Sequence, residues 1–276
     1  MAELNSHPLL VDVDWLCANI DSVRPIDGTW SIPGASAKLP EGYIKRAVSF
    51  DLDTVAMPHA SLKHMLPTSE QFEKAVSAMG VKATDHIVCY DRHGVFSAPR
   101  LWWTFKMFGH KKVSVLDGGL PAWIEAGQPL QHIQSRYDKS EYKSTASLAK
   151  VTDKDGILNA INSEVQIVDA RPEGRFNGTT AEPREGLRGG HMPSAINVSF
   201  SSLRTQTMHF KPIEDLIEAF SEIDPERPII TSCGSGITAA GLAFTLARLG
   251  AEDVTLYDGS WMDYGSDQTV PIIKKD

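Results

Sequence analysis

One cysteine in this chain lies in a setting suited to nucleophilic chemistry. Cys233 follows a short apolar run and opens the small-residue loop Gly234-Ser235-Gly236. Two glycines and a serine let the backbone curl so that successive N–H groups face the sulfur, as in an anion-binding nest. The apolar helix expected after this loop, ending at Gly250, would direct its positive N-terminal end at the same atom. Both features favour a thiolate, which is the nucleophilic form of cysteine.

The other two cysteines lack this context. Most lone cysteines fill hydrophobic cores, because cysteine is among the most buried residue types. Cys17 lies in an amphipathic pattern and Cys89 lies inside the apolar run Ile87–Tyr90, so we expect both in the core. Three cysteines at distant positions form neither a disulfide framework nor a zinc pattern, and they indicate a reducing compartment.

The composition limits the class of protein. The chain has 276 residues, of which 42% are hydrophobic, and this suits two domains with a core each. A net charge of −8 argues against nucleic acid or an anionic membrane as the partner. The first eight residues lack the pattern of a signal peptide, and no apolar run is long enough to span a bilayer. We therefore expect a soluble, cytoplasmic protein.

Elements that could position the cysteine occur twice along the chain. In the second half, apolar runs end at Asp169 and just before Cys233; in the first half, similar runs end at Asp27 and just before Asp91. The same number of positions separates the two residues of each pair, which indicates a tandem duplication. Near-continuous apolar strands that alternate with helices are typical of parallel sheets covered on both faces. We predict an α/β protein of two tandem domains, each a parallel sheet flanked by helices.

The duplication assigns different roles to the two halves. Chemistry in such sheets collects at the carboxyl ends of the strands, where Cys233 lies. Its counterpart is Asp91, which cannot act as a sulfur nucleophile, so we predict a catalytic second half and a first half that serves as scaffold. We place the first domain at residues 1–135, a polar linker at 136–150 and the catalytic domain at 151–276.

The second half has extra residues where the repeat fails, in the segment 175–190. This Gly/Pro-rich loop carries three arginines, and loops tolerate such additions of functional residues. The planar guanidinium pairs bidentately with a carboxylate or a sulfonate. Arg175 and Arg184 are therefore candidate substrate-binding residues, and the alternative is an ordinary surface loop with salt bridges.

The first half has its own extra residues, in the segment 53–67 after a strand predicted at Ala47–Asp53. This segment brings Asp53 and His64, a candidate acid–base pair if both reach Cys233. Spacing alone favours a structural role for this histidine. Other histidines of the chain are no better supported, namely His59, His93 and His191.

The motifs of the chain resemble those of the 3-mercaptopyruvate sulfurtransferases, the tandem-rhodanese branch whose neutral active-site loop runs Cys-Gly-Ser-Gly-Val-Thr-Ala. The loop here runs from Cys233 to Ala239, with Ile237 in place of the valine. The resemblance covers nearly the whole chain. Its further motifs include Asp51-Leu52-Asp53, His64-Met65-Leu66-Pro67, Asp169-Ala170-Arg171, Glu182-Pro183-Arg184 and Tyr257-Asp258-Gly259-Ser260-Trp261.

The resemblance implies two rhodanese-like domains and an enzyme that takes sulfane sulfur from 3-mercaptopyruvate. Pyruvate would be released, and the sulfur would be held as a persulfide on Cys233. The implied acceptor is a thiol, such as thioredoxin or a small thiol, or cyanide in vitro. The resemblance implies no metal and no organic cofactor.

The resemblance also assigns roles to individual residues. Arg175 and Arg184 would bind the carboxylate and the carbonyl oxygen of the substrate. Ser235, His64 and Asp53 would form a proton-relay triad. The residues whose amides would hold the cysteine sulfur are Gly234, Ser235, Gly236, Ile237 and Thr238.

Three other functions fit parts of the pattern. Thiosulfate:cyanide sulfurtransferases of the same fold carry Arg and Lys inside the loop, at the positions of Gly234 and Ser235, so we expect thiosulfate to be a poor donor. A cysteine phosphatase would need a loop arginine to clamp phosphate, and none occurs between Cys233 and Arg248. A non-catalytic binding or regulatory module would account for Asp91 but not for the intact cysteine loop.

Overall fold

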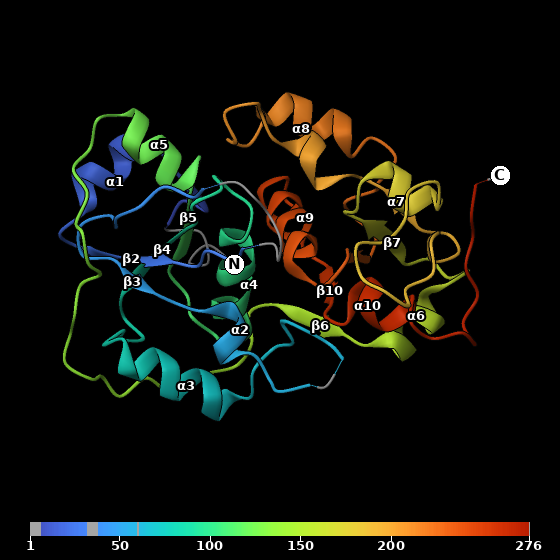
Figure 1. Ribbon diagram of the computed structural model, residues 1–276, viewed down its shortest axis with the longest axis horizontal. Helices are drawn as coiled ribbons and strands as arrows, with labels where there is room; N and C mark the ends of the chain where they lie inside the picture. Colours follow the sequence, from blue (N-terminus) through green and yellow to red (C-terminus); the bar gives the residue numbers. More distant parts are fainter. Residues whose placement is uncertain (1–6, 32–37, 60, 276) are drawn as a thin grey trace. The chain divides into compact units, whose positions relative to one another are not determined.

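The computed structural model describes residues 7–31, 38–59 and 61–275. Most of the segment on which the signal-peptide expectation depends, residues 1–6, lies outside these ranges. The described chain forms two compact units, each built around a five-stranded parallel sheet (Figure 1). The predicted α/β architecture of two parallel sheets flanked by helices is therefore confirmed. The first unit comprises Met1–Met57, Leu66–Leu148 and Gln206–Phe210, and the second comprises Pro58–Met65, Ala149–Thr205 and Lys211–Asp276.

The first unit has the strand order β1-β5-β4-β2-β3. The central strand β4 pairs in parallel with β2 and β5, and its apolar residues are buried because both faces of the sheet are covered. Cys89 on β4 is fully buried, as expected, whereas Cys17 is only partly buried against the core. The elements are β1 (Leu10–Val11), α1 (Val13–Asn19), β2 (Val23–Asp27), β3 (Val48–Ser49), α2 (Leu52–Val55), α3 (Ser69–Ala78), β4 (His86–Tyr90), α4 (Ala98–Met107), β5 (Val113–Leu116) and α5 (Gly119–Glu125).

The second unit repeats this order as β6-β10-β9-β7-β8, strand for strand. A matching order of strands is what a tandem duplication produces. The elements are β6 (Lys150–Thr152), α6 (Lys154–Ala160), β7 (Gln166–Asp169), α7 (Glu173–Asn177), β8 (Ile196–Asn197), the 3-10 helix η1 (Phe200–Leu203), α8 (Ile213–Ala219), β9 (Ile229–Ser232), α9 (Ile237–Arg248), β10 (Val254–Tyr257) and α10 (Ser260–Tyr264).

Helix α9 of the second unit is largely buried. Nine of its residues are buried, which explains why its sequence is apolar on nearly every side. Gly241 allows a close approach to η1, because a Cβ on this residue would lie 2.3 Å from the ring of Phe200. Strand β9 and helix α9 therefore form a closely packed strand–loop–helix unit that contains the cysteine loop. No helix among the described residues is long and apolar enough to cross a membrane.

One predicted strand is shorter than expected. The sequence predicts a strand over Ala47–Asp53, but β3 ends at Ser49 and α2 begins at Leu52. The carboxylate of Asp51 accepts hydrogen bonds from the backbone N–H groups of Asp53 and Thr54, at 2.9 and 3.2 Å. An aspartate in this position caps a helix, so the local side chain overrides the apolar pattern.

Candidate active site

Cys233 lies at the carboxyl end of β9, the central strand of the second sheet. Its side chain is buried, and the backbone N–H of Gly236 donates a hydrogen bond to Sγ at 3.2 Å. Gly236 has φ +83°, a left-handed conformation that glycine adopts without strain, and it serves as the N-cap of α9. The positive end of α9 therefore begins at the loop that holds the sulfur.

The backbone around Cys233 is tied to the start of α10. The N–H of Cys233 donates to Oγ of Ser260 at 3.1 Å, and the N–H of Trp261 donates to the carbonyl oxygen of Cys233 at 2.9 Å. The N–H of Met262 donates to the carbonyl oxygen of Gly234 at 3.0 Å. These three hydrogen bonds tie the cysteine loop to the first residues of α10.

Two arginines lie beside the loop at Gly234. A Cβ placed on Gly234 would lie 3.1 Å from Nη2 of Arg175 and 3.9 Å from Nη1 of Arg184. Burial lowers the pKa of Arg184, and the like charge of Arg175 lowers it further. Cys233 and Glu182 act against that shift of the pKa. Two neighbouring guanidinium groups next to a buried thiol form a site that attracts an anion.

Arg175 comes from a short helix that the sequence did not predict. The segment was expected as a loop, but α7 covers Glu173–Asn177 and ends at Gly178, whose φ is +78°. The carboxylate of Glu182, with a side chain only 1% exposed, accepts hydrogen bonds from Nε and Nη2 of Arg175. The orientation of Arg175 is thus set by a buried partner and not by the loop alone.

Glu182 belongs to a chain of alternating charges. Its other oxygen accepts a hydrogen bond from Nη1 of Arg171 at 2.8 Å, and Arg171 is in turn paired with Asp169 at 2.7 Å. The guanidinium of Arg171 also lies 3.9 Å over the ring of Trp261. Residue types and spacing alone indicate no role for Arg171 and Glu182, although both stand in the motifs that carry the resemblance.

The residues of the expected triad fall in both units. Ser235 lies in the cysteine loop and is buried, and His64 is also buried and belongs to the same unit as Cys233. His64 adopts φ +62°, which a non-glycine residue rarely does. Asp53 belongs to the first unit, in α2, where its carboxylate accepts a hydrogen bond from Nε1 of Trp30 at 3.2 Å. The triad stays a prediction.

The counterpart loop in the first unit is filled by its own carboxylate. Asp91 is fully buried and accepts hydrogen bonds from the backbone N–H groups of His93, Ser97 and Ala98, each at 2.8 Å. Burial raises the pKa of Asp91, while these N–H groups act to lower it. These three amides of the loop are therefore occupied by the carboxylate of Asp91.

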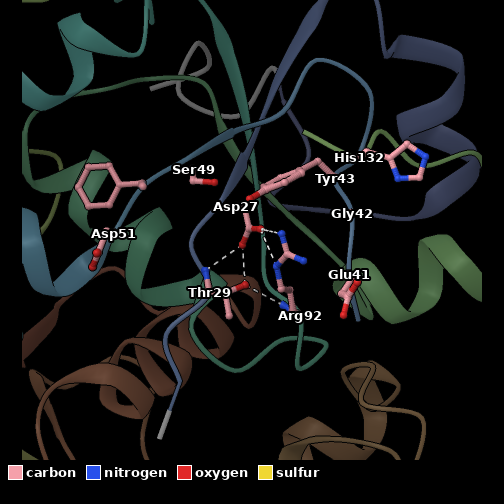
Figure 2. A pocket seen from close by; sticks show the side chains of 10 residues that line it. Asp27, Thr29, Glu41, Gly42, Tyr43, Ser49, Asp51, Arg92 and His132 are labelled. Atoms are coloured by element: carbon pink, nitrogen blue, oxygen red, sulfur yellow. Dashed lines mark hydrogen bonds and ion pairs between the residues drawn. The ribbon is translucent and has the colours of Figure 1, made fainter. Parts of the chain in front are cut away.

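The arginine that follows Asp91 is held by an aspartate. Figure 2 shows Arg92 beside Asp27, whose Oδ2 accepts hydrogen bonds from Nε and Nη2 at 2.9 and 2.7 Å. Thr29 joins the same cluster by donating its hydroxyl to Asp27 and accepting the N–H of Arg92. These groups line a pocket of about 490 Å³ in the first unit. The two loops of the duplication thus differ both in nucleophile and in the placement of their basic groups.

Across the part of the chain that the structure describes, no group of three or more His, Cys, Asp or Glu residues could hold a metal ion.

Comparisons with known proteins show which family the chain resembles. The family model for the rhodanese-like domain matches residues 20–126 and again 153–267. The chain is 37% identical to the thiosulfate/3-mercaptopyruvate sulfurtransferase 1, mitochondrial, of Arabidopsis thaliana, over 97% of this chain and 78% of that protein. It is 36% identical to the 3-mercaptopyruvate sulfurtransferase of Escherichia coli K12, over 95% of this chain and 96% of that protein. The crystal structure of SseA from E. coli, described as a 3-mercaptopyruvate sulfotransferase, superposes with a TM-score of 0.82 and 36% identity, over 92% of this chain and 98% of that chain.

Proposed function

The chain belongs to the rhodanese family and is a sulfurtransferase, and we propose that it moves sulfane sulfur from 3-mercaptopyruvate to a thiol acceptor through a persulfide on Cys233. The observation that carries the choice of donor is the pair Arg175 and Arg184 beside Gly234. The positive charge next to the thiol comes from outside the loop, and the loop itself is neutral.

This placement of charge suits a donor that carries a carboxylate some distance from its sulfur. The two guanidinium groups can bind the carboxylate and the adjacent carbonyl oxygen while the sulfur of the donor reaches Cys233. A loop with a basic side chain at position 234 would instead place its charge at the thiol, where a small inorganic dianion binds. The Cβ of such a side chain would lie 3.1 Å from Nη2 of Arg175, so the side chain would need space beside this guanidinium group.

The chemical steps balance without a cofactor. The Cys233 thiolate attacks the sulfur of 3-mercaptopyruvate, a new S–S bond forms, and the C–S bond breaks. The electron pair of the C–S bond remains on the leaving pyruvate enolate, and a proton then gives pyruvate. We assign delivery of this proton to Ser235, His64 and Asp53. The N–H groups of residues 234–238 stabilise the negative charge on the sulfur.

The second half-reaction returns the enzyme to its starting state. A thiolate acceptor attacks the outer sulfur of the persulfide, forms a new S–S bond and releases the Cys233 thiolate. We propose thioredoxin or a small thiol as the acceptor, and cyanide can replace it in vitro. A cytoplasmic location is part of the proposal, because three cysteines without a disulfide suit a reducing compartment.

Thiosulfate is the second candidate donor, because the Arabidopsis relative is named for both substrates. The deciding experiment measures kcat/KM with each donor under one acceptor. We expect 3-mercaptopyruvate to be preferred by about 100-fold, the effect of one well-placed charge-assisted hydrogen bond. Equal or better turnover of thiosulfate would overturn the assignment of the donor. Retention of sulfur transfer by Cys233→Ser would overturn the assignment of the nucleophile.

A further inference from the structure

Ser260 is a buried serine with an unfavourable backbone conformation. Its φ is +50°, in the left-handed region that residues with a side chain rarely adopt, and the residue is fully buried. Its hydroxyl donates a hydrogen bond to the carbonyl oxygen of Tyr257 at 2.9 Å and accepts one from the N–H of Cys233 at 3.1 Å. Strain of this kind persists only where the surroundings impose it, and it often marks a functional site.

The first unit shows what this position looks like without a nucleophile. Gly119 occupies the same place after the matching aspartate and glycine, and its φ is +54°. The next residue, Leu120, donates its N–H to the carbonyl oxygen of Asp91 at 2.9 Å, just as Trp261 does to Cys233. A Cβ on Gly119 would lie 2.3 Å from that carbonyl oxygen, so this unit leaves no room for a side chain.

The two halves therefore share the backbone conformation and differ in the side chain. The half that lacks the cysteine uses glycine, which adopts this conformation without strain. The half that has the cysteine uses serine at the same conformation, and the hydroxyl is bonded to the backbone of the cysteine itself. The strained serine thus occurs in the half of the duplication in which its hydroxyl can accept a hydrogen bond from the nucleophile's backbone.

We propose that Ser260 is a positioning residue for Cys233. Its hydroxyl fixes the peptide between Ser232 and Cys233, and this keeps Sγ on the N–H of Gly236. Without the hydroxyl the peptide can rotate, and the sulfur loses its alignment with that N–H. The inference rests on the proposed function in that Cys233 is taken as the nucleophile.

The position predicts a separation of kinetic effects. Arg175 and Arg184, which we propose bind the donor, lie in the segment 175–190. Ser260 instead contacts the backbone N–H of Cys233. Loss of the hydroxyl should therefore lower kcat and leave KM for the donor nearly unchanged. A residue needed only for folding would lower the amount of active protein and would not slow each active site.

Two substitutions separate the hydroxyl from the strain. Ser260→Ala removes the hydroxyl and keeps a side chain at the left-handed position, and Ser260→Gly removes the hydroxyl and the strain together. The matched control is Ser194→Gly, because Ser194 has φ +62°, belongs to the same unit and is exposed. The full-length variants are compared by kcat and KM, by the rate at which iodoacetamide alkylates Cys233, followed by mass spectrometry, and by thermal midpoint.

We expect kcat and the alkylation rate to fall about three- to tenfold in both Ser260 variants, which is the usual effect of one hydrogen bond. The glycine variant should melt at a higher temperature than the alanine variant, and Ser194→Gly should keep wild-type kcat. A wild-type kcat and alkylation rate in Ser260→Gly would overturn the proposal, even if Ser260→Ala fails to fold. Alkylation needs no donor, so this result stands apart from a failure of the wild type to use 3-mercaptopyruvate.

Discussion

Replacing Glu182 by glutamine tests whether the charge chain places Arg175. The side chain of Glu182 is 1% exposed and accepts hydrogen bonds from both Arg171 and Arg175. Glutamine keeps the shape and one acceptor oxygen, but its NH₂ group must face a guanidinium N–H. The donor–donor contact forces either Arg175 or the new side chain out of its present position.

The expected magnitude follows from the burial of the three groups. Breaking a buried ion pair by removing one partner costs about 3–5 kcal/mol. We expect Glu182→Gln to lie at the lower end of this range, about 3 kcal/mol less stable than the wild type. Glutamine keeps one acceptor oxygen, and the side chain of Arg175 is 20% exposed. Loss of one charge-assisted contact between Arg175 and the donor carboxylate raises KM by about 10- to 100-fold.

The assay measures urea unfolding together with kcat and KM for 3-mercaptopyruvate. Glu185→Gln is the control, because this residue lies in the same loop, is exposed and loses the same charge. Glu182→Gln also adds one unit of net positive charge to the site, which by itself would attract an anionic donor more strongly. A KM that stays unchanged or falls would therefore refute the argument that Glu182 acts by placing Arg175.

Three further predictions follow from the two units. Gly234→Arg should reduce kcat/KM for 3-mercaptopyruvate by at least about 100-fold, since the new side chain needs the space beside Arg175; a variant that turns over normally would contradict the geometry. Asp91→Asn should lower stability by about 1–3 kcal/mol, because its NH₂ meets a backbone N–H, while kcat stays unchanged; a changed kcat would contradict the scaffold role. Burial, with the charges of nearby basic groups, lowers the pKa of His86 to about 4, so the unfolded chain binds a proton more readily. The free energy of unfolding should fall by about 1–2 kcal/mol as the pH drops from about 6.5 to about 4, a figure reduced because His86 is partly exposed. Urea unfolding at a series of pH values should show a weaker pH dependence of stability for His86→Gln.

Much of this site could be predicted from the sequence because its signals are local. A cysteine after an apolar run and before Gly-Ser-Gly determines a strand, a tight loop and a helix within a few residues. The duplication adds a second local signal, since the matching spacing of Asp91 and Cys233 predicts which half carries the nucleophile. The regular strands and helices around both loops follow from the same periodicity.

The features that could not be predicted from the sequence depend on contacts between different segments, or on one side chain that overrides the local apolar pattern. The contact of Glu182 with Arg171 and Arg175 needs a folded loop in which a buried carboxylate meets two guanidinium groups, and spacing alone cannot distinguish this from a solvated surface. Helix α2 was missed because the carboxylate of Asp51 caps it where the apolar pattern favours a strand. The strained backbone of Ser260 leaves no trace in its residue type.

The burial of Cys233, a residue only 2% exposed, has a consequence for the regiochemistry of sulfur release. In a persulfide the outer sulfur lies about 2.05 Å beyond Sγ, so we expect it to be the more accessible of the two atoms. An acceptor thiolate that attacked Sγ would be trapped as a mixed disulfide with the enzyme and would expel hydrosulfide. We therefore expect an acceptor to attack the outer atom, which would transfer the sulfur to the acceptor instead of releasing it to solution.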